Sequence, residues 1–113
     1  MSRDNVYLLD ILKAAKLAIN YLEGKRREEF LKDTQCQDAV IRRLEIIGEA
    51  AGKVSATTTT KFPTLPWKKM VSMRNIMIHE YEDVDLSIVW DTVQNDLPPL
   101  ITLLAPLIPK EEE

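Results

Sequence analysis

Apolar residues recur at helical spacing along most of the chain. Residues 8–22 place leucine, isoleucine and alanine at three- and four-residue steps, and residues 40–54 repeat this pattern. A third run begins near Leu65, and a fourth is interrupted by Pro98 and Pro99, each of which removes a backbone donor. The pattern predicts an all-α protein, namely an antiparallel up-down bundle of four to five helices with a kinked C-terminal helix.

Residues that favour helix ends delimit these segments. Helix N-caps are expected at Asp4, Thr34 (in a capping box with Gln37), Thr64 and Asp85. Gly24 predicts the end of the first helix. Residues 25–32, anchored by Phe30 and Leu31, either extend that helix or form a separate short one. The threonine-rich residues 56–61 predict a loop, because β-branched residues in a row form helices poorly.

Composition narrows the class of protein. A chain of 113 residues with 45% hydrophobic residues is expected to form a single domain over 1–113, with a disordered acidic tail from about 110 to 113. The net charge of −3 means that any nucleic-acid contact needs a local basic patch. One cysteine excludes an internal disulfide and a multi-cysteine metal site. The longest apolar stretch, 97–109, is too short to span a bilayer, so we expect a cytoplasmic protein. We also expect that it needs no cofactor.

The only histidine, His79, lies near the end of the third predicted helix. On a helical wheel the methionines of this segment share one side, while Lys68, Ser72, Asn75 and His79 form a separate polar stripe. One interpretation is structural: a histidine at a helix C-terminus interacts favourably with the terminal carbonyl groups. The other interpretation is catalytic.

The catalytic interpretation is RNA cleavage by attack of the 2′-hydroxyl on the adjacent phosphorus. Histidine transfers protons near neutral pH, and Arg74 would stabilise the negative charge that develops on the phosphorus oxygens. Asn75 could orient His79 or a phosphate oxygen. The reaction needs both an acid and a base, so one histidine per chain favours a two-fold homodimer that brings two copies together.

The sequence Arg74-Asn75-Ile76-Met77-Ile78-His79-Glu80-Tyr81 resembles the Arg-x4-His-x-Tyr motif of HEPN domains, and more specifically the HepT-like toxin branch. Residues 41–51, 66–67 and 83–98 resemble the segments that flank this motif in the family, so the resemblance covers roughly residues 5–105. It implies a helical bundle that dimerises. It also implies a metal-independent endoribonuclease with Arg74 and His79 as catalytic residues and Asn75 in support.

The resemblance further implies a toxin–antitoxin module. The partner would be a nucleotidyltransferase antitoxin of the MNT type, which can transfer AMP from ATP onto the motif tyrosine, here Tyr81. Glu80 departs from the residue that relatives often carry, and its carboxylate would either raise the pKa of His79 or disfavour RNA. Two alternatives stay open: a catalytically weak helical module whose main role is to bind the nucleotidyltransferase, and a plain helical interaction domain.

Other residues have two interpretations each. The missing basic patch could come from Arg42, Arg43, Lys68 and Lys69, although such residues also occur on ordinary solvated helix faces. Trp67 and Trp90 could stack on bases or belong to the core. Cys36 is expected to have no catalytic role, because no second histidine is available to activate it.

Overall fold

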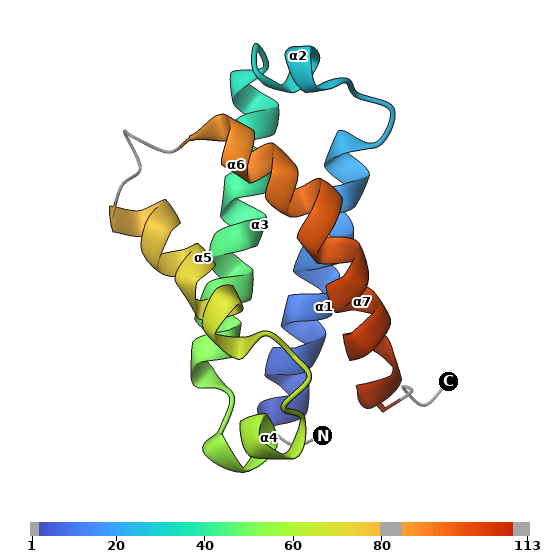
Figure 1. Ribbon diagram of the computed structural model, residues 1–113, viewed down its shortest axis with the longest axis vertical. Helices are drawn as coiled ribbons and strands as arrows, with labels where there is room; N and C mark the ends of the chain where they lie inside the picture. The colour runs from blue at the N-terminus through green and yellow to red at the C-terminus, as the bar shows by residue number, and fades with distance from the viewer. Residues whose placement is uncertain (1–2, 80–84, 110–113) are drawn as a thin grey trace.

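Long helices pack side by side in alternating directions (Figure 1). The computed structural model describes residues 3–79 and 85–109, and the side chains of residues 75–79 lie outside this description. The helical elements, in chain order, are α1 (Arg3–Leu22), α2 (Arg27–Phe30), α3 (Thr34–Lys53), α4 (Ala56–Lys61), α5 (Trp67–His79), α6 (Leu86–Asp91), η2 (Thr92–Asp96), α7 (Leu97–Leu104) and η3 (Ala105–Leu107). The predicted all-α bundle is confirmed.

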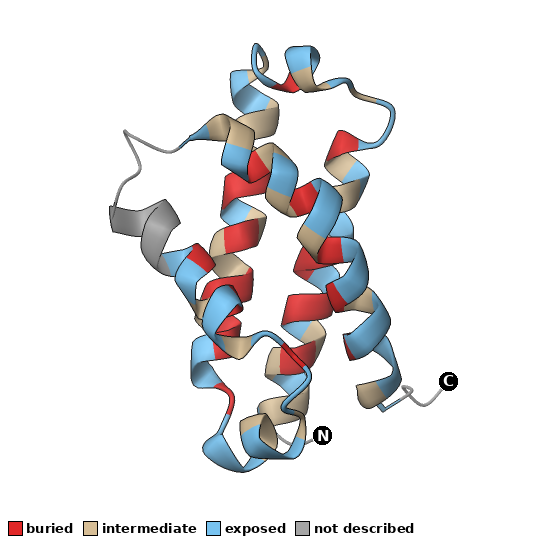
Figure 2. Cartoon of the chain, in the orientation of Figure 1, coloured by how far each residue is buried: buried red, intermediate tan, exposed pale blue. Residues whose placement is uncertain are grey.

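The core lies where α1, α3 and the C-terminal helices face one another (Figure 2). Ile11, Leu44 and Leu97 are fully buried there, and burying a side chain of this size contributes about 1.5–3 kcal/mol. Met70 and Met73 of α5 are also buried. The predicted methionine face is therefore confirmed for these two residues, whereas the side chain of Met77 lies outside the described part.

Several predicted helix ends are confirmed. Gly24 follows α1 with a φ of 78°, a conformation that favours glycine. The Asp85 carboxylate caps α6 by accepting a hydrogen bond from the Ser87 amide at 2.9 Å. Residues 25–32 contain the separate helix α2, and Phe30 anchors it in the core. The prediction that Leu31 is a second anchor is wrong, because its side chain is 39% exposed.

Three of the four predicted N-caps are wrong: Asp4 lies inside α1, and the other two miss the start of their helices by one to three residues. Asp33 caps α3, because its carboxylate accepts a hydrogen bond from the Cys36 amide at 3.0 Å, and Thr34 is the first helical residue. Helix α5 begins at Trp67, directly after a proline, so Thr64 lies outside it. At α3 the cap is therefore the residue directly before the predicted one.

The predicted loop over residues 56–61 is also wrong, because this segment forms α4. The Ser55 side chain accepts a hydrogen bond from the Thr58 amide and so caps the helix. The Asp4 carboxylate accepts hydrogen bonds from the Ser55 amide at 3.1 Å and from the Ser55 and Thr58 hydroxyls at 2.5 Å each. Asp4 thus lies inside α1 and fastens α4 to it, which offsets the low helix propensity of the threonines.

The paired prolines lie in the first turn of α7, where proline is tolerated, and neither can donate an N–H to the preceding turn. The preceding residues, Thr92–Asp96, form a π-helical turn, and the C-terminal run changes direction between α6 and α7 (Figure 1). The predicted kink therefore takes the form of a wider turn followed by a new helix.

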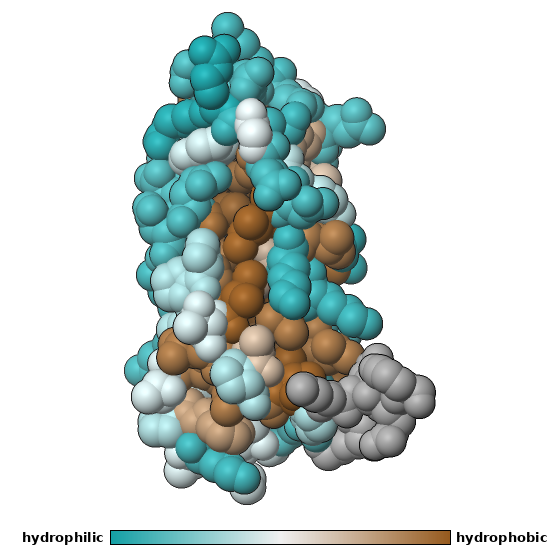
Figure 3. All heavy atoms as spheres, turned by 90° about the vertical axis from the view of Figure 1, so that its right-hand side faces the viewer, coloured by the Kyte–Doolittle hydropathy of each residue, from teal (hydrophilic) through white to brown (hydrophobic). Residues whose placement is uncertain are grey.

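The side of the bundle that carries α7 exposes apolar side chains in a band between polar ones (Figure 3). Leu103 of α7 is 41% exposed, whereas Leu100 and Leu104 are buried. The C-terminal apolar piece is therefore partly core and partly surface. No helix in the described part of the chain is long and apolar enough to cross a membrane. The predicted disordered tail at residues 110–113 lies outside the described residues.

Candidate active site

Helix α5 carries the arginine of the candidate catalytic motif. Its start is fixed by Trp67, whose indole Nε1 donates a hydrogen bond to the Phe62 carbonyl at 2.9 Å. Met70 and Met73 then bury one side of the helix. Arg74 follows Met73 directly and is exposed. Within the described part of the chain its side chain forms no ion pair, and a guanidinium group is suited to binding an anion such as phosphate.

Gly48 of α3 sets how closely α5 approaches at Arg74. A Cβ atom at position 48 would lie 2.2 Å from the Arg74 Cβ, 2.5 Å from its backbone nitrogen and 2.8 Å from its Cα. Two of these three atoms belong to the backbone and cannot rotate away. Only glycine is therefore compatible with this crossing of α3 and α5. The crossing in turn fixes the position of the Arg74 backbone and Cβ atom.

A cavity of about 340 Å³ lies beside this crossing and is lined by Glu49, Gly52, Lys53 and Arg74. Among the residues that the structure describes, two cations and one carboxylate line it, so this part of its wall has a net positive charge. The Glu49 carboxylate also lies 3.9 Å from the Arg42 guanidinium. This ion pair reduces the effect of the Glu49 charge on the cavity. Arginine and lysine together are suited to binding a phosphate group.

The structure does not describe the remaining motif side chains. Asn75 and His79 lie in α5, which ends at His79. Only their backbone is described, and their side chains lie outside the described part. Tyr81 lies outside the described residues altogether. Along the helix, His79 is five residues beyond Arg74, which corresponds to about 7.5 Å at 1.5 Å per residue.

The four basic residues predicted to bind RNA have different surroundings. Arg42 forms ion pairs with Glu45 and Glu49, and Lys69 lies 3.1 Å from Asp96. Lys68 lines a second cavity between α3, α4 and α5. The Nε atom of Arg43 is buried and has no hydrogen-bond partner among the residues that the structure describes. Of the four, Lys68 is thus the one that combines exposure with a cavity.

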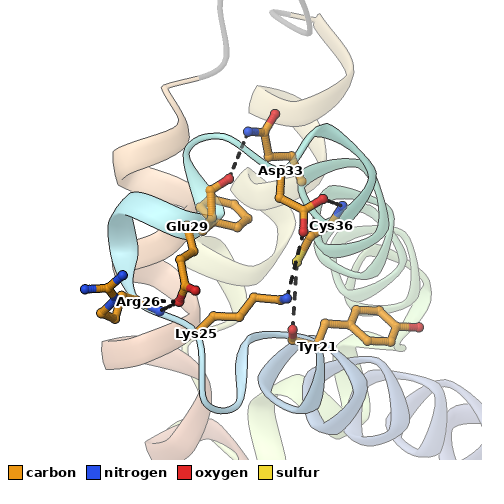
Figure 4. A network of polar contacts seen from close by, with 8 residues as sticks. Tyr21, Lys25, Arg26, Glu29, Asp33 and Cys36 are labelled. Carbon is orange, nitrogen blue, oxygen red and sulfur yellow. Dashed lines mark hydrogen bonds and ion pairs between the residues drawn. The ribbon is translucent and has the colours of Figure 1, made fainter.

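Cys36 lies at the opposite end of α3, twelve residues or about 18 Å from Gly48. Its sulfur donates a hydrogen bond to the Tyr21 carbonyl at 3.8 Å, in a polar network with Asp33 and Lys25 (Figure 4). Burial raises the pKa of the Cys36 thiol, and the negative charge of Asp33 raises it further. A protonated thiol in a structural contact is a poor nucleophile.

Both tryptophans are half-buried. The ring of Trp90 packs against Phe30, with centroids 5.7 Å apart, so it belongs largely to the core. Trp67 lines the second cavity, which has a volume of about 710 Å³. The sequence did not reveal this cavity, because its walls come from three separate segments. The only sequence feature that points to it is the stripe that begins with Lys68 and Ser72.

Residues 11–107 match the family described as HepT-like, ribonuclease HepT-like. A protein of Thermococcus cleftensis named as a probable ribonuclease HepT is 42% identical over 94 residues, which are 83% of this chain and 86% of the relative. A protein of Methanocaldococcus jannaschii, named as a candidate RNase, is 40% identical over 102 residues (88% of this chain, 94% of the relative). Another candidate RNase, from Caldanaerobacter subterraneus subsp. tengcongensis, is 34% identical over 112 residues (99% and 100%). No solved structure matches the chain.

Proposed function

Because the chain belongs to the HepT-like ribonuclease family, we propose that it is a metal-independent endoribonuclease whose active site is completed in a homodimer. The observation that supports this proposal is the exposed Arg74, which together with Lys53 lines a cavity whose described wall has a net positive charge. Gly48 allows α5 to approach α3 closely at this residue. The histidine of the motif follows five residues, or about 1.4 turns, later in the same helix.

In the proposed reaction the 2′-hydroxyl of the RNA attacks the neighbouring phosphorus, and the bond to the 5′-oxygen breaks. The proton of the hydroxyl passes to a base, and an acid protonates the leaving oxygen. His79 of one chain takes one of these roles and His79 of the second chain takes the other. Arg74 stabilises the charge on the non-bridging oxygens, and Asn75 orients the histidine or the phosphate.

The test is RNA cleavage by the purified protein in the presence of a chelator. The wild type should produce ends with a 2′,3′-cyclic phosphate, and Arg74→Ala and His79→Ala should each lower the rate by roughly a hundredfold or more. Lys16→Ala, an exposed change on α1, is the matched control and should cleave normally. Cleavage that survives His79→Ala would contradict the proposal.

The same proposal extends to a toxin that a nucleotidyltransferase antitoxin of the MNT type neutralises by transferring AMP onto Tyr81. The phosphate of AMP on the motif tyrosine would add negative charge, which would repel RNA and could bind Arg74 in place of the substrate. Incubation with such an enzyme and ATP should add the mass of AMP to the wild type and not to Tyr81→Phe, and cleavage should stop. A stable complex with the nucleotidyltransferase but no cleavage by the unmodified protein would favour the partner-binding alternative instead.

A further inference from the structure

The second cavity has no role in the reaction proposed above. It has a volume of about 710 Å³ and is lined by Ala51, Gly52, Thr59, Thr60, Pro63, Trp67, Lys68, Val71 and Ser72. Its walls are the end of α3, the end of α4 and the first two turns of α5. This volume lies within the range of about 300–1,000 Å³ that is usual for small-molecule sites.

The cavity combines an aromatic ring with a positive charge. The indole of Trp67 is held in one orientation by its hydrogen bond to the Phe62 carbonyl at 2.9 Å. Lys68 is exposed and forms no ion pair among the described residues, whereas the neighbouring Lys69 is bound to Asp96. The described residues that line the cavity include no aspartate or glutamate. An anion with a flat aromatic group attached therefore fits this lining better than a cation does.

Hydroxyl groups complete the cavity wall. The Thr59 hydroxyl donates a hydrogen bond to the Ala56 carbonyl at 3.2 Å, and the Ser72 hydroxyl donates to the Lys68 carbonyl at 2.8 Å. Since each donor is already used, the two oxygens act as acceptors toward a ligand. Acceptors of this kind suit the amino and imino groups of a nucleobase or the hydroxyl of a ribose.

We propose that this cavity binds one nucleotide of single-stranded RNA, with its base on Trp67 and its phosphate on Lys68. This inference rests on the proposed function for the position of the scissile bond. Ser72 precedes His79 by seven residues in α5, or about 10.5 Å along the helix axis. Roughly three stacked nucleotides span that length at about 3.4 Å each, and fewer are needed if the strand is extended. The cavity would thus hold a nucleotide near, but not at, the bond that is cut.

Binding is measured with an RNA oligonucleotide that carries 2′-O-methyl groups, because it lacks the attacking hydroxyl and cannot be cleaved. In the full-length Trp90→Phe protein, Trp67 is the sole tryptophan, and stacking of a base should quench its fluorescence. Lys68→Gln should raise the Kd about five- to tenfold and make the dependence on salt less steep by about one charge. Trp67→Leu, checked for folding by circular dichroism, should raise the Kd about tenfold or more.

The matched control is Lys16→Gln, which removes the same charge from an exposed position of α1. Lys16 is twelve residues, or about 18 Å, from Asp4, the residue at which α1 contacts α4. This variant should bind the oligonucleotide within about twofold of the wild type, because a single distant surface charge is largely screened.

The outcomes separate this inference from the proposed function. If the wild type cleaves RNA through His79 but Lys68→Gln binds normally and Trp67 is not quenched, the inference is overturned and the nuclease proposal stands. If the oligonucleotide binds with the predicted losses but no RNA is cut, the inference stands and the nuclease proposal fails. If Trp67 emission responds to protein concentration rather than to RNA, a second copy of the chain covers the cavity, and the inference is again overturned.

Discussion

At the scale of single residues, the contact between Gly48 and Arg74 joins stability to the candidate active site. Replacing Gly48 by alanine would place a methyl group within 2.8 Å of two backbone atoms of Arg74, so α3 and α5 would have to separate. The free energy of unfolding should therefore fall by about 1–3 kcal/mol, as for other overpacked contacts. Urea denaturation measures this loss, and RNA cleavage should fall with it because Arg74 moves.

Gly52 provides the matched control on the same helix. A Cβ atom there meets nothing within 4 Å, so Gly52→Ala should raise the free energy of unfolding by up to about 1 kcal/mol through helix propensity alone. Equal stability of the two alanine variants would show that α5 accommodates the methyl group and would contradict the packing argument.

At the scale of elements, the start of α3 distinguishes Asp33 from Thr34, two adjacent residues of types that are both common at helix N-caps. The Asp33 carboxylate accepts the capping hydrogen bond from the Cys36 amide at 3.0 Å, so Asp33→Ala should lower the free energy of unfolding by about 1 kcal/mol. Thr34 lies one residue inside the helix and is exposed. Thr34→Ala should therefore change stability by less than about 0.5 kcal/mol. If thermal or urea unfolding showed a larger loss of stability for Thr34→Ala than for Asp33→Ala, Thr34 would be the N-cap, as the sequence predicted.

The contact between α1 and α4 predicts a pH dependence. Hydrogen bonds from the Ser55 and Thr58 hydroxyls and from the Ser55 amide hold the pKa of Asp4 below its usual value. The stabilisation is therefore fully present above the unfolded pKa of about 3.9 and is lost as the pH falls through the lower folded pKa. Asp4→Asn should have a lower Tm than the wild type at pH 7, and the difference should shrink below about pH 4. A difference that persists unchanged to pH 2.5 would contradict this account.

These elements also mark what the sequence can predict. The long helices were predictable because each has its own apolar periodicity, and so was the place of Arg74 on one of them. The catalytic role of Arg74, which was inferred from its spacing to His79, stays a prediction. Helix α4 was not, because it depends on Asp4, which is 51 residues away from Ser55. The role of Gly48 and the cavity beside Trp67 likewise depend on segments that meet only in the folded chain.

At the scale of the whole molecule, the shortage of histidine makes the proposed dimer testable by mixing. Wild type and His79→Ala are co-expressed in equal amounts with different tags, so that the subunits pair at random. About one quarter of the dimers are then wild type in both chains. If each site needs His79 from both chains, only these dimers are active. RNA cleavage per total protein should then fall to about one quarter of the undiluted wild type. If each chain worked alone, it should fall only to about one half. The control replaces His79→Ala with Lys16→Ala, which leaves every dimer with both histidines and should retain full cleavage.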